Sequence, residues 1–276
     1  MKMLIIGADS YVGARVYFEI SKKYETIGTY YQDKLSKRFL YLDITDRNNV
    51  NKLITKQQPT IIIHVANNSS AKWCKENKKK AIEINQKSTE FIVQTANLIK
   101  AKMIYISSFS AIEYADIYGK TKFESEQIIK KVRAGYLILR LSLVLGFSPN
   151  TKNDRPFNRL LKNLDQSTQA IYDISWKFKL TYLGHVCEVI AAAIDKDIWF
   201  EKIPVAVEGL RTRYEVAKDI LSYFNIKVKK INNQDKTPIN RENLSKLKNL
   251  KLPTYTYNQV IKKIIEEIKN RNDFKL

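Results

Sequence analysis

The 276-residue chain is poor in cysteine, histidine, proline and glycine, with two, two, six and eight of each. Cys74 and Cys187 stand far apart and neither has a CxxC neighbour, so a disulfide scaffold is excluded and both are predicted to be reduced thiols. His64 and His185 have no Cys or His partner at ligand spacing, so no metal site is predicted. His64 lies inside an apolar run, where a buried, hydrogen-bonded histidine is the usual finding.

Long hydrophobic runs are also absent. The longest apolar stretch, Tyr136 to Gly146, contains Arg140 and is too short to span a bilayer. The first apolar run, Met1 to Ile6, leads directly into a glycine turn and is too short for the apolar region of a signal peptide. A cytoplasmic protein without a membrane partner is therefore expected.

Acidic residues are outnumbered by basic ones, which gives a formal net charge of +20. One interpretation is binding to nucleic acid or to another anionic surface. The other is a lysine-rich composition spread over solvated helix faces. We favour the second, because the lysines are scattered and no recognition motif accompanies them, so no nucleic-acid partner is predicted. In either case a basic protein attracts phosphorylated ligands.

Short apolar runs alternate with longer amphipathic segments over the first 145 residues. The runs are rich in β-branched residues, as buried parallel strands are. The predicted strands are Met3–Ile6, Thr26–Tyr30, Phe39–Leu42, Thr60–Val65, Met103–Ile106 and Tyr136–Arg140, and the helices between them extend to Lys22 and over Arg47–Lys56, Lys78–Ile99 and Tyr118–Val132. This alternation predicts a Rossmann-like, doubly wound parallel sheet of the α/β class.

The pattern changes after Gly146, where a turn-rich connection begins. Later segments predict a strand end and apolar helix over Thr181–Ile194, then helices over Arg213–Asn225 and Asn258–Arg271. We therefore expect a dinucleotide-binding domain over residues 1–146, to which residues 177–198 return. Residues 147–176 and 199–276 would form a smaller C-terminal α/β lobe that binds substrate.

A glycine loop, Gly7 to Gly13, follows the first predicted strand and opens a helix, which is the context of a dinucleotide fingerprint. Gly7 permits the tight turn, and Gly13 lets the helix pack closely on the strand. The helix N-terminus offers N–H groups to a pyrophosphate. Ser10 replaces the central glycine, and its hydroxyl is a candidate phosphate ligand. The alternative is a strand–helix turn that binds nothing.

The second predicted strand ends without the acidic residue that holds the ribose 2′-hydroxyl of NAD. Lys34, Lys37 and Arg38 lie nearby instead, which favours NADP(H) over NAD(H), although ordinary loop lysines are an equal alternative. Asp43 ends the third strand, where it would accept a hydrogen bond from the adenine amino group or cap a helix.

Tyr118 and Lys122 are four residues apart at the start of a predicted helix and therefore share a face. A phenol has a pKa near ~10, and an adjacent ammonium lowers it. The tyrosine can then exchange a proton with a substrate oxygen as hydride moves to or from its carbon. Ser107 and Ser108 end the preceding strand, where ligands bind in such sheets. Ordinary surface and turn residues are the competing interpretation of this motif.

These motifs resemble the extended short-chain dehydrogenase/reductase superfamily, and within it the dTDP-4-dehydrorhamnose reductase branch. The resemblance runs almost end to end, through Leu42–Asp46, His64–Asn67, Asn85, Ile104–Ser108, Glu124, Glu126, Leu139–Ser142, Thr181–Leu183, Arg213–Ala217 and Asn240–Lys246. It implies catalytic roles for Ser108, Tyr118 and Lys122. It also implies cofactor contacts from Gly7, Ser10, Tyr11, Val12, Gly13, Lys34, Asp43, Ile44, Ala66, Asn67 and Lys122.

The resemblance implies an NAD(P)H-dependent oxidoreductase acting on a 4-keto-6-deoxy nucleotide sugar in surface polysaccharide precursor synthesis. Ser108 would position the oxygen, Tyr118 would deliver the proton, and Lys122 would hold the nicotinamide ribose. The same core serves nucleotide-sugar epimerases and dehydratases, and a homodimer is possible. The chain departs from the family at Ser10, at His185, where an aspartate is common, and in the short segment Phe109–Ile117. This short segment favours a different alternative, a non-catalytic NADP-binding regulatory subunit like that of methionine adenosyltransferase.

Overall fold

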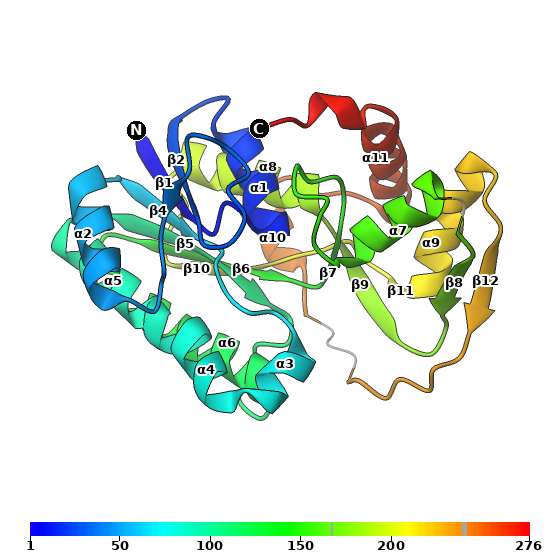
Figure 1. Cartoon of the computed structure of the whole chain (residues 1–276), viewed down its shortest axis with the longest axis horizontal. Coiled ribbons are helices and arrows are strands. Elements are labelled where there is room, and N and C mark those ends of the chain that lie inside the picture. Colours follow the sequence, from blue (N-terminus) through cyan, green and yellow to red (C-terminus); the bar gives the residue numbers. More distant parts are fainter. Residues whose placement is uncertain (167, 239–241) are drawn as a thin grey trace.

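The computed structural model describes residues 1–166, 168–238 and 242–276, and its centre is a seven-stranded parallel sheet (Figure 1). The strand order is β10-β6-β5-β4-β1-β2-β3, and every neighbouring pair is parallel. The strands are β1 (Lys2–Ile6), β2 (Glu25–Tyr30), β3 (Leu40–Tyr41), β4 (Ile61–His64), β5 (Lys102–Ser108), β6 (Tyr136–Leu141) and β10 (Glu201–Val205). The predicted Rossmann-like sheet is confirmed.

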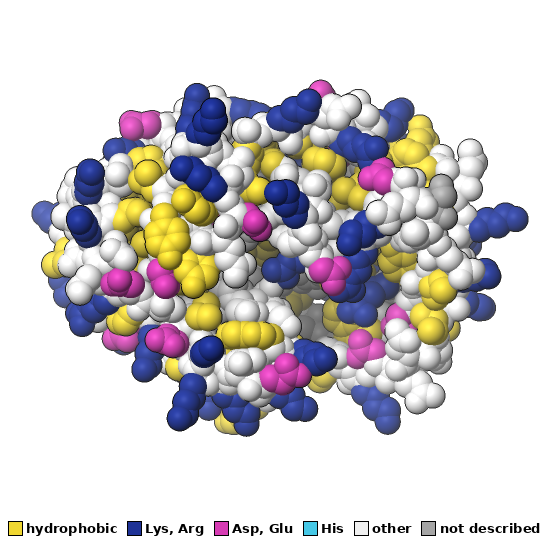
Figure 2. All heavy atoms as spheres, in the orientation of Figure 1, with side chains coloured by type: hydrophobic (Ala, Val, Ile, Leu, Met, Phe, Trp, Pro, Cys, Tyr) yellow, Lys and Arg dark blue, Asp and Glu magenta, His cyan; other side chains and the backbone are white. Residues whose placement is uncertain are grey.

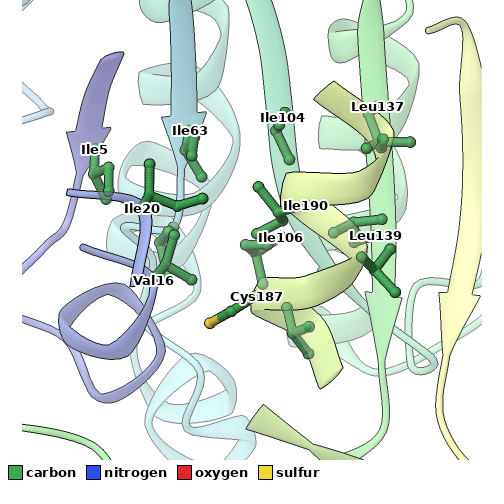
Figure 3. Close-up of a cluster of buried hydrophobic side chains, with 14 of the residues drawn as sticks. Ile5, Val16, Ile20, Ile63, Ile104, Ile106, Leu137, Leu139, Cys187 and Ile190 are labelled. Carbon is green, nitrogen blue, oxygen red and sulfur yellow. The ribbon is translucent and has the colours of Figure 1, made fainter. Parts of the chain in front are cut away.

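Helices cover both faces of this sheet. Helices α1 (Tyr11–Ile20) and α8 (Leu183–Asp195) lie on one face, and α2 (Arg47–Gln57), α5 (Ser88–Leu98) and α6 (Ile117–Ile129) on the other (Figure 1). Alternate strand residues point to opposite faces, so Ile5 packs toward α1 and α8 while Leu4 packs toward α2 and α5. Figure 3 shows the first of these layers, with Ile190 of α8 among the strand isoleucines.

The predicted helix over Lys78–Ile99 is interrupted. The chain forms α3 (Ala71–Glu76), which the sequence analysis did not predict, then α4 (Lys78–Ile82), a π-helical turn over Glu83–Lys87, and α5. Such a turn inserts an extra residue into the helix and often marks a functional site. Here it carries Asn85, which is fully buried.

The smaller lobe has its own core. It contains a three-stranded sheet of β7 (Leu143–Leu145), β9 (Lys177–Tyr182) and β11 (Leu210–Thr212), and a pair, β8 (Ala170–Asp173) and β12 (Val228–Ile231). Helices α7 (Pro156–Asp165), α9 (Arg213–Leu221) and α11 (Tyr257–Lys269) pack with them through buried leucine, isoleucine, valine and phenylalanine side chains. A short helix, α10 (Ser245–Asn249), instead joins the core of the large sheet through Leu247.

Two segments bear on the expected domain boundaries. Helix α8 packs on the large sheet, within the range 177–198 that was expected to return there. Strand β10, however, pairs with β6, although residues 199–276 were assigned to the smaller lobe. Its Pro204 suits an edge strand, where one side needs no N–H donors. Of the family-like segment Asn240–Lys246, residues 240 and 241 lie outside the described residues.

The two halves are joined by a buried ion pair. On α1, Arg15 donates to Glu267 of α11 at 2.6 Å, and both side chains are nearly inaccessible to solvent. The same carboxylate accepts hydrogen bonds from the Tyr182 hydroxyl at 2.6 Å and from the Phe147 N–H at 2.7 Å. Opposite charge and hydrogen bonding are what make such burial tolerable. The last long helix is thereby fixed to the first.

The two histidines are buried, as an apolar setting predicts for His64. Its Nε2 lies 3.1 Å from the Thr89 hydroxyl, but its Nδ1 has no partner among the described residues. In α8, His185 contacts the Pro253 carbonyl through Nε2 at 2.7 Å, and Tyr182 at the start of that helix supplies no side-chain cap. Within the described ranges no three His, Cys, Asp or Glu side chains are grouped for a metal ion, and no helix is long and apolar enough to cross a bilayer.

Candidate active site

The phosphate loop between β1 and α1 is closely packed around its two glycines. Gly7 has a φ of +88°, and a Cβ built on it would lie 2.7 Å from the backbone N of Ala66. A Cβ on Gly13 would lie 2.0 Å from the Gly7 carbonyl oxygen. Both positions therefore require glycine, and the loop lies directly against the end of β4.

Ser10 completes the turn from within. Its hydroxyl donates to the Gly7 carbonyl at 2.8 Å and accepts from the Gly13 N–H at 3.0 Å, which makes Ser10 the N-cap of α1. The hydroxyl proton is directed at the Gly7 carbonyl in this arrangement, and the expected contact of Ser10 with a phosphate stays a prediction. The N–H groups of Tyr11 and Val12, in the first helical turn, are the donors that the loop offers.

A second segment holds this loop from outside. The Ser148 hydroxyl donates to the Tyr11 carbonyl at 2.6 Å, and the Asn150 side chain donates to the Asp9 carbonyl at 2.5 Å. The Tyr11 hydroxyl in turn donates to the Gly146 carbonyl. Ser148 and Asn150 are both buried. This clamp was not predicted, because the sequence there indicates only a turn-rich connection.

A cleft of about 350 Å³ opens between the loop, the end of β5 and the smaller lobe (Figure 2). The cleft brings together seven of the expected site residues, namely Ser10, Tyr11, Val12, Asn67, Ser108, Tyr118 and Lys122. The Oδ1 atom of Asn67 is buried there without a hydrogen-bond partner among the described residues. A buried orphan acceptor next to free helix N–H groups is a feature that a bound ligand satisfies. The cleft therefore fits a dinucleotide.

Tyr118 and Ser108 form the centre of this cleft. Ser108 is the last residue of β5, and Tyr118 is in the first turn of α6, which Asp116 caps by accepting from the Gly119 N–H at 2.8 Å. Burial raises the pKa of the Tyr118 phenol, while a hydrogen bond with Ser108 and the positive charge of Arg155 oppose that rise. The sequence analysis expected Lys122 to lower this pKa, and in that respect it was wrong.

Lys122 is buried and points to the sheet. Its Nζ donates to the Ile106 carbonyl at 2.7 Å and lies 4.1 Å from the centre of the Tyr105 ring. Burial lowers the pKa of this ammonium to about 7, against the opposing charge of Glu126 on the next turn of α6. With one N–H bonded to the Ile106 carbonyl, the Lys122 ammonium has two further N–H positions for other partners.

Asn85 ties the π-helical turn to the catalytic helix. Its side chain accepts from the Asn68 N–H at 2.7 Å and donates to the Asn68 carbonyl at 3.0 Å and to the Thr121 hydroxyl at 3.2 Å. The loop after β4 and the start of α6 are thus held by one amide. Asn85 was noted only as a family-like position, and the structure makes it a positioning residue.

Arg155 and Trp176 line the cleft and were not predicted. The Arg155 guanidinium donates to the Ser69 hydroxyl at 2.6 Å and has no carboxylate partner among the described residues. The Trp176 ring stacks on Phe178 with a centroid separation of 5.2 Å, and its indole N–H is buried without a partner in the described part of the chain. No local sequence pattern marks either residue, because the cleft wall forms only after the smaller lobe folds.

Six expected cofactor residues lie outside the cleft lining, namely Gly7 and Gly13, which shape the loop, and Lys34, Asp43, Ile44 and Ala66. Lys34 lies with its Nζ 5.5 Å from the centre of the Tyr30 ring. Asp43 accepts from the N–H of Thr45 at 2.9 Å and from its hydroxyl at 2.7 Å, whereas Asp46 caps α2. Ile44 packs on the core under α2, and Ala66 lies against Gly7. Their expected cofactor contacts stay predictions.

Comparison with known proteins places this geometry in a family. The chain is 25% identical over 159 residues to the Bos taurus methionine adenosyltransferase 2 subunit beta, which covers 52% of this chain and 47% of that protein. It is 23% identical over 220 residues to the dTDP-4-dehydrorhamnose reductase of Aggregatibacter actinomycetemcomitans, covering 75% and 71% of the two chains. The chain thus spans about half the length of the first of these curated relatives.

The fold matches solved structures over nearly the whole chain. The Bacillus anthracis dTDP-4-dehydrorhamnose reductase in complex with NADP superposes with a TM-score of 0.81 at 20% identity, covering 96% of this chain and 98% of that one. The model of the RmlD substrate binding domain family matches residues 1–270. The chain therefore belongs to the RmlD substrate binding domain family, a branch of the extended short-chain dehydrogenase/reductase superfamily.

Proposed function

We propose that the protein is an NAD(P)H-dependent reductase of a 4-keto-6-deoxy nucleotide sugar, serving surface polysaccharide precursor synthesis. The carrying observation is that Ser108, Tyr118 and Lys122 meet in one cleft with the N–H groups of Tyr11 and Val12. Relatives named as dTDP-4-dehydrorhamnose reductases support the substrate class. The cytoplasmic location and a possible homodimer stay predictions.

The proposed chemistry assigns each side chain one task. A bound nicotinamide dinucleotide supplies the hydride. Tyr118 donates a proton to the substrate carbonyl oxygen, which Ser108 holds by a hydrogen bond. Lys122 binds the nicotinamide ribose hydroxyls and, with a pKa of about 7, returns a proton toward Tyr118. Tyr11, Val12 and Asn67 hold the dinucleotide.

The smaller lobe would bind the nucleotide sugar. We assign residues 143–182 and 206–276 to this lobe, apart from helix α10, and assign helix α8 and strand β10 to the dinucleotide-binding half. Arg155 and Trp176 face the cleft from the lobe and offer a cation and an indole donor. The predicted preference for NADP(H) has the support of a neighbour solved with NADP.

The experiment is a test of turnover in one matched pair of variants. Tyr118→Phe removes the proposed proton donor, and Tyr114→Phe removes a hydroxyl from a ring that is 92% exposed in the preceding loop. We expect Tyr118→Phe to lower kcat by roughly 10²- to 10⁴-fold with dTDP-4-dehydrorhamnose, and Tyr114→Phe to leave it unchanged. Equal activity in both variants would overturn the proposal.

A second candidate function is a non-catalytic, dinucleotide-binding regulatory subunit. Its specific support is the similarity to methionine adenosyltransferase 2 subunit beta. The intact arrangement of Ser108, Tyr118 and Lys122 argues against it. Dinucleotide binding without turnover of any keto nucleotide sugar, in the wild type as in Tyr118→Phe, would favour this second function.

A further inference from the structure

The end of β2 has no acidic residue of its own, yet a carboxylate lies there. Asp9, in the loop between β1 and α1, accepts hydrogen bonds through Oδ2 from the N–H of Tyr31 at 2.9 Å and of Gln32 at 3.4 Å. These are the two residues directly after β2. A residue of the phosphate loop thus occupies the place where the strand-end acid was missing.

Hydrogen bonds hold both the backbone and the side chain of Asp9 in place. Its carbonyl accepts from the buried Asn150 side chain at 2.5 Å, while its carboxylate is held by the two backbone N–H groups. The side chain remains partly exposed. Among the described lysines and arginines none forms an ion pair with Asp9. The carboxylate therefore lies at the end of β2 without a compensating cation among the described residues.

Lys34 does not offset this charge. Its Nζ lies 5.5 Å from the centre of the Tyr30 ring, a cation–π geometry, and no hydrogen bond or ion pair of that ammonium is found in the described chain. Lys37 and Arg38 are exposed farther along the same loop. The cations for which the sequence analysis favoured NADP(H) therefore do not pair with the Asp9 carboxylate.

In a Rossmann sheet the adenosine ribose of the dinucleotide lies at the carboxyl end of β2, where a carboxylate accepts from its 2′-hydroxyl. A 2′-phosphate at that place would bring a second negative group against the carboxylate, and like charges in contact disfavour binding. Resting on the dinucleotide site proposed above, we infer that Asp9 is a specificity-determining residue that selects a free 2′-hydroxyl. The protein then prefers NAD(H) to NADP(H).

The test compares two probes that carry only the adenosine end of the cofactor, ADP-ribose and 2′-phospho-ADP-ribose. The full chain is titrated with each by calorimetry. We expect ADP-ribose to bind about tenfold more tightly or better. Asp9→Asn keeps an acceptor for the Tyr31 N–H but loses the charge, so it should fold normally and bring the two dissociation constants together.

Two further variants make the result decisive. Asp33→Asn removes the same charge from an exposed position in the neighbouring loop and should leave the selectivity unchanged. Lys34→Ala should not weaken binding of 2′-phospho-ADP-ribose. The inference is overturned if the wild type prefers the phosphorylated probe, if Asp33→Asn acts as strongly as Asp9→Asn, or if Lys34→Ala abolishes phosphate binding. If neither probe binds, the proposed dinucleotide site fails as well.

Discussion

The side-chain amide of Asn150 donates a hydrogen bond to the backbone carbonyl of Asp9 at 2.5 Å, across 141 residues of chain. The contact fixes the phosphate loop from a segment that already belongs to the smaller lobe. Together with the buried Ser148, which donates to the Tyr11 carbonyl, Asn150 couples the shape of the loop to the position of the lobe. This coupling leads to the first of four predictions.

Asn150→Ala should weaken dinucleotide binding about tenfold, a change of about 1.4 kcal/mol. The reason is that the partly buried Asp9 carbonyl loses the donor that holds the loop, and an acceptor left unpaired on burial costs about 1–3 kcal/mol. Calorimetric titration with the dinucleotide measures the effect. Asn48→Ala, at an exposed position on α2, is the control and should bind as the wild type does. Equal affinity in both variants would contradict the role of the clamp.

Gly7→Ala should destabilise the protein more than Gly209→Ala. Both glycines have a φ of +88°, so both alanines share the left-handed backbone strain of about 1–2 kcal/mol. Only at Gly7 does the new Cβ meet backbone at 2.7 Å, whereas the nearest atom to Gly209 is the end of Arg211 at 3.4 Å. Urea unfolding of the two variants measures the difference. Matching midpoints would show that the loop does not press on Ala66.

Stability should rise with pH above neutrality because of Lys122. Its pKa is about 7 in the folded protein against an ordinary value of 10.5, so between these values the unfolded chain binds more protons. The free energy of unfolding then increases with pH, with a slope of at most about 1.4 kcal/mol per unit. The buried His64, whose pKa is lowered to about 3, changes the free energy of unfolding in a separate pH range, below pH ~6.5.

Lys122→Met isolates this effect, since it keeps the length of the side chain and loses the charge. Urea unfolding is measured from about pH 6.5 to about pH 9 for both proteins. The variant should lack the rise and should exceed the wild type most at the acidic end. Parallel curves for the two proteins would rule out a lowered pKa at this lysine.

Glu267→Gln should destabilise the protein by at most about 3–5 kcal/mol, because it removes the buried carboxylate partner of Arg15 and leaves only Glu19, at 3.0 Å on the same helix, to offset the charge. The comparison is Asp165→Asn, which breaks the exposed Arg271–Asp165 pair and should change stability by about 0–1 kcal/mol. Replacing both members, as Arg15→Met with Glu267→Leu, should recover part of the loss. A Glu267→Gln protein as stable as Asp165→Asn would argue against a buried pair.

The sequence predicted what short-range patterns control. All six predicted strands appear, because a buried parallel strand is a run of apolar residues that needs no distant information. Strand β10, which follows helix α8, was missed since Pro204 interrupts its apolar pattern. The helix over Lys78–Ile99 was predicted without its π-helical turn, which depends on where Asn85 finds Asn68 and Thr121.

The candidate site likewise contains residues that the sequence predicted and residues that it did not. Ser108, Tyr118 and Lys122 were predicted from their place after a strand, and they line one cleft. Arg155 and Asn150 contact residues that are 86 and 141 positions away in the sequence. Sequence motifs with a fixed short spacing do not reveal such contacts. The pKa of Tyr118 was predicted in the wrong direction, because the desolvation of the phenol depends on residues distant in the sequence that surround it in the cleft.

The Arg15–Glu267 pair also orders events during synthesis. The two residues are 252 positions apart, so Arg15 leaves the ribosome long before its carboxylate partner is translated. At about 5–20 residues per second, this guanidinium waits on the order of ten seconds or more, and it must stay hydrated until then. The junction between α1 and α11 is therefore completed only after Glu267 has been translated.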